Sequence, residues 1–229
     1  MDSSSFLNIR VRAYLRTPIV SDEWLPLDGV LLYQHVRSDI GVQEFSISGA
    51  SILTQPKGEP IKGGRMPIAI VHGKDWYYRC SWAQWGPHAD GQDYWSKRFD
   101  MTHASLIDFN GKRGRVDTSA ATYKAYRMLV FYRSALWVEW YMKCDENWLR
   151  NILPMITHLG KKTSQGWGRV MNWEIEPIEK DMSIWKEGKL MRGIPIIDLP
   201  KDFVPSRIGY YGVRPPYWDN RNQMELVLP

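Results

Sequence analysis

Hydrophobic and polar positions alternate with a period of two in three stretches of the sequence, and this period predicts β-strands with one buried face. The first stretch is 8–16, in which Ile9 and every second residue up to Leu15 are apolar. The intervening positions are mostly arginine. The same alternation recurs at 136–143 and at 171–176. We therefore expect three half-buried strands, the first with a basic exposed face.

Two segments place apolar residues at helical spacing. The first helix is expected over 28–37, with its first residue, an aspartate, as the N-cap. The second begins after the capping residue Asp145 and extends to about Leu159, with Gly160 as the C′ glycine. Pro154 lies inside this span, so it should kink the helix or end it early.

The middle and the carboxyl end of the chain contain fewer periodic runs. Residues 55–67 are dense in glycine and proline and predict a loop, whereas 68–71 and 76–82 have the composition of short strands. The stretch 83–133 mixes glycine, charge and aromatic residues, which is typical of an insertion. Residues 181–229 hold six of the fourteen prolines and predict an irregular tail, packed on the domain or on a neighbour.

The order of these elements is strand, helix, strand-rich insertion, strand, helix, strand. This order predicts an α+β fold with a ferredoxin-like core, the βαββαβ arrangement also found in RRM domains, with a large insertion after the first helix. We expect a single domain over 1–180 and a peripheral C-terminal extension over 181–229. Because this topology supports many functions, it identifies none by itself.

Basic residues are concentrated in one part of the chain. The 229 residues carry 30 Lys and Arg against 25 Asp and Glu, a formal net charge of +5. The segment 97–133 alone holds eight basic residues against three acids, interleaved with tyrosines. This pattern indicates contact with a phosphate backbone, and the alternative is a solvated basic face. The candidate RNA contacts here are Lys97, Arg98, Lys112, Arg113, Arg115, Lys124, Tyr126 and Arg127.

Residues 159–170, with the sequence LGKKTSQGWGRV, form a glycine-rich loop between the second helix and the last strand. Glycines permit backbone conformations that a Cβ forbids, and exposed N–H groups beside cations can hold phosphate oxygens. P-loop and dinucleotide-binding patterns do not match, and the RNP1 motif matches only in part. The alternative is an ordinary turn with Trp167 in the core. The candidate phosphate-binding residues here are Gly160, Lys161, Lys162, Ser164, Gln165, Gly166, Trp167, Gly168 and Arg169.

No pattern in the sequence requires catalysis. The five histidines lack metal-ligand spacing, and neither a nucleophile elbow nor a carboxylate pair occurs. Cys80 and Cys144 are too few for a disulfide framework or a metal cluster. We expect a non-enzymatic protein without metal or cofactor. Because no membrane-length apolar run or secretory leader is evident, we expect it to be cytoplasmic, without a membrane partner.

Four short segments together carry a family resemblance. They are LPLDGVLLY (25–33), KRFD (97–100), YKAYRM (123–128) and THLGKKTSQGWGRV (157–170). With them the chain resembles the RAMP superfamily of CRISPR-associated proteins, and most of all the type IV subunit that binds the guide-RNA 5′ handle. The resemblance covers about 6–178. It implies a ferredoxin-like core, a guide-RNA contact at the glycine-rich loop, and a β-hairpin thumb within 61–133.

The resemblance implies a non-catalytic subunit of a type IV CRISPR effector ribonucleoprotein. Such a subunit would cap the 5′ handle of the guide RNA (crRNA), contact backbone and large subunits, and support RNA-guided targeting of DNA. Two alternatives stay open. One is a metal-independent endoribonuclease, with His103 or His158 as general acid or base and Lys124 stabilising the phosphorane. The other is a stand-alone RNA-binding or scaffolding module.

Overall fold

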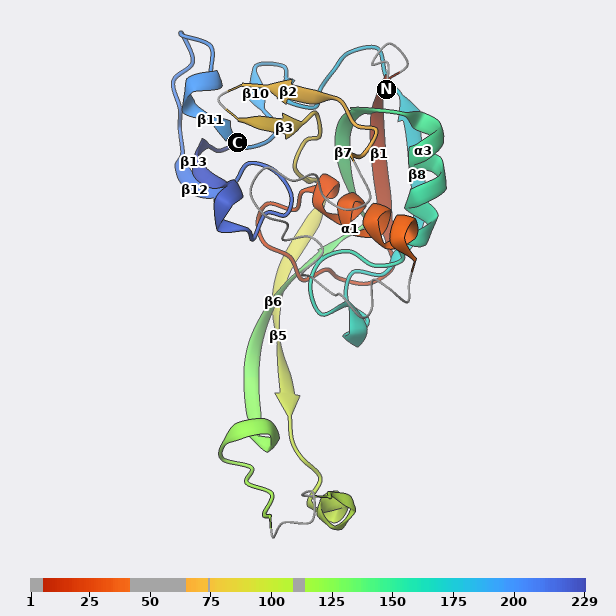
Figure 1. Cartoon of the computed structure of the whole chain (residues 1–229), viewed down its shortest axis with the longest axis vertical. Coiled ribbons are helices and arrows are strands. Elements are labelled where there is room, and N and C mark those ends of the chain that lie inside the picture. Colours follow the sequence, from red (N-terminus) through yellow and green to blue (C-terminus); the bar gives the residue numbers. More distant parts are fainter. Residues whose placement is uncertain (1–5, 42–64, 74, 109–113) are drawn as a thin grey trace.

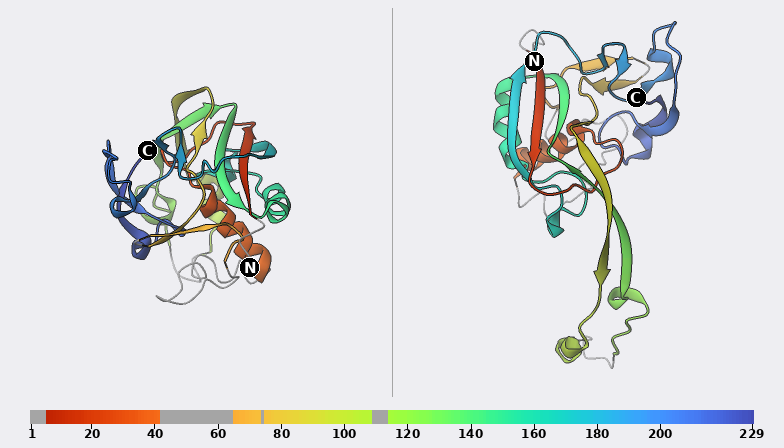
Figure 2. Two further views of the ribbon diagram at one scale, coloured as in Figure 1. Left: turned by 90° about the horizontal axis from the view of Figure 1, so that it is seen from above. Right: turned by 180° about the vertical axis from the view of Figure 1, so that it is seen from behind.

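The largest sheet has four antiparallel strands in the order β4-β7-β1-β8. Its helices, α1 and α3, lie on one face, and a long two-stranded ribbon extends away from it (Figures 1 and 2). The fold is therefore α+β, as predicted. The structure, a computed structural model, describes residues 6–41, 65–73, 75–108 and 114–229. The strands are β1 (Leu7–Leu15), β4 (Gln84–Trp85), β7 (Trp137–Cys144) and β8 (Val170–Pro177).

The three strands predicted from alternation are confirmed as β1, β7 and β8. Ile9, Val11 and Ala13 are fully buried, and they pack with the apolar residues of β7 against the helices. Two residues expected on the buried face are exposed, Leu136 to 71% and Met171 to 66%. Leu136 precedes β7, where the chain leaves the ribbon, and Met171 lies at an irregularity in the β1–β8 register. Alternation therefore fails where the sheet ends.

The first predicted helix is confirmed as α1 (Leu27–Ile40), which is longer than expected. The expectation for Asp28 is wrong. Pro26 occupies the N-cap position without a side-chain bond, and Asp28 lies inside the first turn, where it is fully buried. The reason is tertiary: this carboxylate has partners from the far end of the chain.

The second helix, α3 (Glu146–Ile152), is capped as predicted. The Asp145 carboxylate accepts a hydrogen bond of 2.8 Å from the backbone N–H of Trp148. The α-helix ends well before Leu159 because Pro154 allows only one further 3₁₀ turn, η5 (Leu153–Met155). Gly160 is therefore not a C′ residue, since it lies beyond both helical turns.

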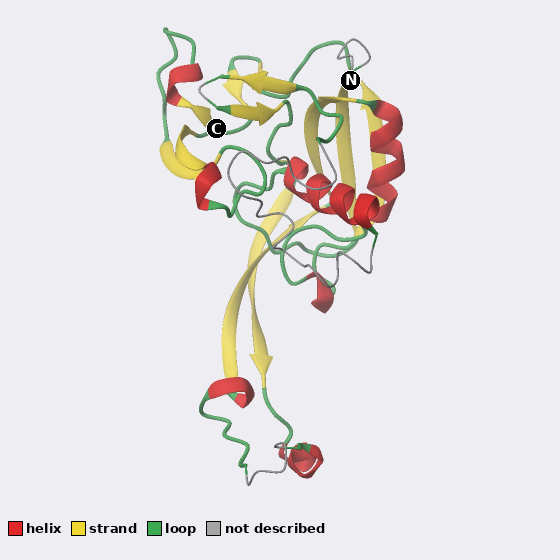
Figure 3. Ribbon diagram, in the orientation of Figure 1, coloured by secondary structure: helices red, strands yellow, loops and turns green. Residues whose placement is uncertain are grey.

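Two hairpins lie between α1 and β7 in the described part of the chain. The first, β2 (Ile70–His72) with β3 (Trp76–Tyr78), confirms the two short strands in part, and most of the predicted 55–67 loop lies outside the described residues. The second is the ribbon, in which β5 (His88–Lys97) pairs with β6 (Tyr126–Ala135) over ten residues each. Figure 3 shows its two strands ending in a tip with short helices, η3 (Met101–Leu106) and η4 (Ala121–Tyr123).

The C-terminal segment is not irregular, so that expectation is wrong. It forms one small two-stranded sheet and one three-stranded sheet in the order β11-β13-β12, with a second hydrophobic core. These strands have only two to five residues, too few to show a period, and most prolines lie between them. The strands are β9 (Trp185–Lys186), β10 (Lys189–Leu190), β11 (Ile194–Pro195), β12 (Ile208–Gly212) and β13 (Gln223–Val227). Two further 3₁₀ turns are η7 (Ile196–Asp198) and η8 (Asn220–Asn222).

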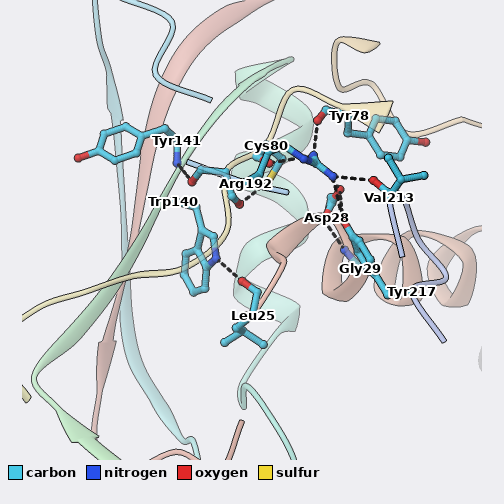
Figure 4. A network of polar contacts seen from close by, with 11 residues as sticks. Leu25, Asp28, Gly29, Tyr78, Cys80, Trp140, Tyr141, Arg192, Val213 and Tyr217 are labelled. Atoms are coloured by element: carbon cyan, nitrogen blue, oxygen red, sulfur yellow. Dashed lines mark hydrogen bonds and ion pairs between the residues drawn. The ribbon is translucent and has the colours of Figure 1, made fainter. Parts of the chain in front are cut away.

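A buried polar network joins this segment to α1 (Figure 4). The fully buried Arg192 guanidinium donates to the carbonyls of Cys80 at 2.9 Å and Val213 at 2.8 Å. It also lies 3.7 Å from the Asp28 carboxylate, to which the Tyr217 hydroxyl donates at 2.7 Å. Burial raises the pKa of Asp28, although Arg192 and Tyr217 oppose this shift. The network explains why Asp28 is buried and makes the C-terminal segment part of the folded core.

Candidate nucleic-acid interface

The glycine-rich loop, 159–170, lies where β1 ends and the ribbon begins. Its two ends meet through a 2.8 Å hydrogen bond from the Leu159 N–H to the Gly168 carbonyl. Its outer side is held by the segment 17–20, whose Pro18 and Val20 carbonyls accept hydrogen bonds from the loop. Segment 17–20 in turn pairs with the base of β6 through Ile19 and Arg133. The loop is thus fixed to both the sheet and the ribbon.

Two glycines of the loop have different structural roles. Gly168 has a φ of +68°, and a Cβ there would lie 1.9 Å from the Leu159 carbonyl oxygen. Gly166 has a φ of +88° but open space around it. The first glycine permits a close backbone approach, while the second only permits the left-handed turn that ends η6 (Thr163–Gln165).

Most of the loop's described N–H contacts are internal to the protein. The N–H groups of Lys161, Gln165, Gly166 and Gly168 donate to protein carbonyls at 2.6 to 3.0 Å. These four groups are therefore not available as a phosphate cradle, contrary to that part of the sequence interpretation. A phosphate contact at the loop therefore has to come from its side chains or from its other N–H groups, such as those of Thr163 and Ser164.

The loop's side chains connect it to one face of the ribbon. Lys162 adopts the left-handed conformation, with a φ of 57°, and its Nζ lies 4.2 Å from the centre of the Trp95 ring. Trp167 is half-buried, with its ring centre 5.2 Å from that of Tyr132. Lys161 instead forms an exposed ion pair of 2.6 Å with Asp22. Ser164 and Gln165 are exposed on η6.

The same face of the ribbon continues as a row of aromatic and basic residues. Trp95 and Tyr126 have ring centres 5.1 Å apart, and the Lys97 Nζ lies 5.9 Å from the Tyr126 ring. In the antiparallel register Lys97 faces Tyr126, and Trp95 faces Met128, so all four lie on one side. Arg127 lies on the opposite side, with its guanidinium 3.8 Å from the Tyr94 ring centre.

Sequence analysis missed Trp95 and Tyr132, the two rings of this face that contact the loop. A period of two groups Tyr126 with Tyr132, but the unbroken apolar run 128–132 between them hides this alternation. We call the loop 159–170 together with Trp95, Lys97, Tyr126 and Tyr132 the loop–ribbon surface.

The remaining basic candidates lie at the tip of the ribbon. Arg98, Arg115 and Lys124 are exposed there. Lys112 and Arg113 lie outside the described residues. The structure therefore separates the predicted site into two parts, the loop–ribbon surface and a basic tip.

The exposed face of β1 is not a basic surface, so that expectation is wrong. Arg10 forms ion pairs with Glu174, at 2.8 Å, and with Glu176. Arg12 forms one with Glu139 at 2.7 Å. These three carboxylates come from β7 and β8, and their pairing with β1 could not be deduced from the alternation alone.

The candidate catalytic residues do not come together as one group. His158 forms a backbone β-bridge with Arg169 at the loop, whereas Lys124 follows η4 at the tip of the ribbon. The loop is held beside Arg133 of β6, and Arg133 lies seven residues along that strand from Tyr126, about 23 Å at ~3.3 Å per residue. His103 lies on η3, also at the tip. Among the described residues, no three His, Cys, Asp or Glu side chains form a group able to hold a metal ion.

A family model described as CRISPR type IV associated protein Csf3 matches residues 8–229. The chain belongs to this family. The match confirms the resemblance to type IV CRISPR-associated proteins. It also extends into 181–229, for which the sequence offered no motif. No protein with a curated description matches this Csf3-family chain.

One similarity to a solved structure is to a chain in the "Cryo-EM structure of the Type III-B Cmr-beta bound to cognate target RNA", with 13% identity and a TM-score of 0.37. It covers 76% of this chain and 62% of that one, so this chain spans less than two thirds of the other's length. At this TM-score the likeness supports no functional argument. No helix in the described part of the chain is long and apolar enough to cross a membrane.

Proposed function

We propose that this chain is a non-catalytic guide-RNA-binding subunit of a type IV CRISPR effector ribonucleoprotein. The observation that carries the proposal is the loop–ribbon surface, where Lys162 lies on Trp95 and Trp167 lies on Tyr132. Rings beside cations are the groups with which proteins hold single-stranded nucleic acid. Membership of the type IV family supplies the biological setting for such a surface.

The proposed fold of the body is a ferredoxin-like core. The strand order β4-β7-β1-β8, with α1 after β1 and α3 between β7 and β8, is the order expected of a βαββαβ unit. Here β4 supplies only two residues to the edge, and the ribbon occupies the connection from β4 to β7. In this proposal the ribbon is the thumb implied by the family resemblance.

The proposed ligand is the 5′ handle of the guide RNA. The loop and the ribbon meet at one end of the sheet, so an RNA strand could be held by the loop and by the ribbon at once. The exposed cations of the tip would then contact phosphates further along the strand. The proposed partners are the backbone and large subunits of the effector complex, with target DNA engaged by the assembly, in the cytoplasm.

The absence of catalysis is part of the proposal. General acid–base chemistry needs groups within hydrogen-bond reach of the reacting atoms, about 2.6–3.2 Å. The separation of His158 and Lys124 along the ribbon supports this view for that pair. We expect no cleavage when the protein is incubated with its repeat RNA in EDTA. A specific product that His103→Ala or His158→Ala abolishes would contradict the proposal.

The test of handle binding is reconstitution of the effector complex on altered guides. One guide lacks the 5′ handle, one carries a scrambled handle of equal length, and a control lacks the same number of nucleotides at its 3′ end. We expect the chain to be lost from complexes on the guide without a handle and retained on the 3′-truncated control. Equal incorporation on both truncated guides would contradict handle capping, while the scrambled guide measures sequence preference.

A further inference from the structure

Arg10 and Arg12 of β1 and Arg16, which follows the strand, differ in whether a carboxylate neutralises them. They lie at alternate positions on the polar face of the sheet. Arg10 and Arg12 are both paired with glutamates of the neighbouring strands. Arg16, at the end nearest the glycine-rich loop, is exposed and has no hydrogen bond or ion pair with another described side chain. Of these three arginines, Arg16 is therefore the one without a carboxylate partner among the described side chains.

Arg16 lies in a cross-strand row with Arg169 and His158. The pairing of Leu15 with Val170 continues through a 2.8 Å hydrogen bond from the Arg16 N–H to the Arg169 carbonyl. Arg169 also forms an antiparallel bridge with His158. Directly opposed residues of antiparallel strands project to the same face, with Cβ atoms about 5 Å apart. The three side chains therefore project together.

The backbone beneath this row is held in place. The Thr17 hydroxyl oxygen accepts a hydrogen bond of 2.9 Å from the Arg169 N–H, and the hydroxyl donates to the Gly166 carbonyl at 2.8 Å. Two adjacent guanidinium groups repel each other unless an anion lies between or across them. Arg169, like Arg16, is exposed and has no carboxylate partner among the described side chains. The row therefore places two guanidinium groups without carboxylate partners on a backbone that is held in place.

We propose that Arg16 and Arg169, with His158 beside them, bind neighbouring phosphates of the guide-RNA strand next to the loop. This inference rests on the proposed function and deepens it. It adds Arg16, which the sequence did not single out as an RNA contact. It also gives the strand a path from the loop–ribbon surface over the end of the sheet, rather than along β1, where the arginines already have carboxylate partners.

The experiment is a salt titration of RNA binding by the full chain with single-stranded guide RNA. Each single-strand phosphate contact contributes about 0.7 to the slope of log affinity against log salt. Arg16→Gln and Arg169→Gln should each lower the slope by about 0.7, and the double variant by about 1.4. Arg10→Gln is the matched control, because it removes the same charge from the same strand face, and its slope should equal that of the wild type. Arg16→Lys, which keeps the charge, should retain the slope.

The outcomes separate this inference from the proposed function. If the wild type binds RNA but neither arginine variant changes the slope, or Arg10→Gln lowers it equally, the row is not a phosphate site and the proposed function stands. If the wild type does not bind guide RNA at all, both are overturned. Inorganic phosphate added at constant ionic strength should compete weakly, since it occupies only one position. Full displacement of RNA by millimolar phosphate would contradict binding of consecutive phosphates. Melting curves confirm that each variant is folded.

Discussion

Arg192→Met should destabilise the protein strongly, because it leaves the buried Asp28 carboxylate without its cation. The arginine is fully buried, and the substitution also removes donors from the carbonyls of Cys80 and Val213. Removing one partner of a buried ion pair costs about 3–5 kcal/mol. For a chain of 229 residues, a shift of about 2–4 °C per kcal/mol gives a fall in Tm of roughly 6–20 °C.

The stability lost in Arg192→Met should depend on pH in a defined direction. Burial already raises the pKa of Asp28 in the folded protein, and Arg192 opposes that shift, so removing Arg192 raises the pKa further. A carboxyl group with a raised folded pKa favours folding at low pH, and this contribution is lost as pH rises through the folded pKa. The free energy of unfolding lost in Arg192→Met should therefore be larger at pH 8 than at pH 5.

Urea unfolding at both pH values, followed by circular dichroism, measures these effects. The matched control is Arg207→Met, which removes an exposed arginine paired with Glu23 at 2.8 Å and should leave the midpoint within error. A double-mutant cycle with Asp28→Asn isolates the pair. A loss below about 1 kcal/mol for Arg192→Met, or a loss equal to that of the control, would refute the inference that this network holds the C-terminal segment to α1.

Three further predictions concern the loop and the core. Gly168→Ala should lower the stability of the fold by about 3 kcal/mol, because the added Cβ would overlap the Leu159 carbonyl oxygen. Gly166→Ala has open space around it and should lower stability by only about 1–2 kcal/mol. Equal melting temperatures of the two variants would contradict this. Trp167→Ala should weaken RNA binding by about 1–3 kcal/mol with the salt slope almost unchanged, because its ring is part of the proposed stacking surface. A lower melting temperature with unchanged RNA binding would show that the ring only holds the loop to the ribbon. Burial raises the pKa values of the Cys80 and Cys144 thiols, so neither should be alkylated at pH 8 before unfolding, as followed by intact mass; rapid modification of the native protein would show that the core opens.

The sequence predicted the body of the fold well where the pattern is local and long enough. The alternation of β1 and β7 and the Asp145 cap depend on neighbouring residues, and both are confirmed. Asp28 looked like a cap because its sequence context is that of one, but its partners Arg192 and Tyr217 come from distant parts of the chain. Contacts between residues so far apart in the sequence leave no pattern among the residues next to Asp28.

The candidate site was predicted in outline but not in its connections. The glycine-rich loop and the basic insertion were both singled out, yet the rings that join them, Trp95 and Tyr132, were not. Net charge also misled on β1, because Arg12 looks free in the sequence and is neutralised by Glu139 from another strand. Charge counts along a sequence cannot show such pairing, which depends on strand register.

The most direct test of guide-RNA binding is photo-crosslinking in the assembled effector complex. A guide with 4-thiouridine at successive positions of the 5′ handle would be irradiated, and the crosslinked peptides of this chain identified by mass spectrometry. We expect crosslinks in 159–170 and in the ribbon strands β5 and β6, at adjacent handle positions. Crosslinks confined to other subunits, or in this chain only to 181–229, would contradict the central claim that the loop–ribbon surface holds the guide RNA.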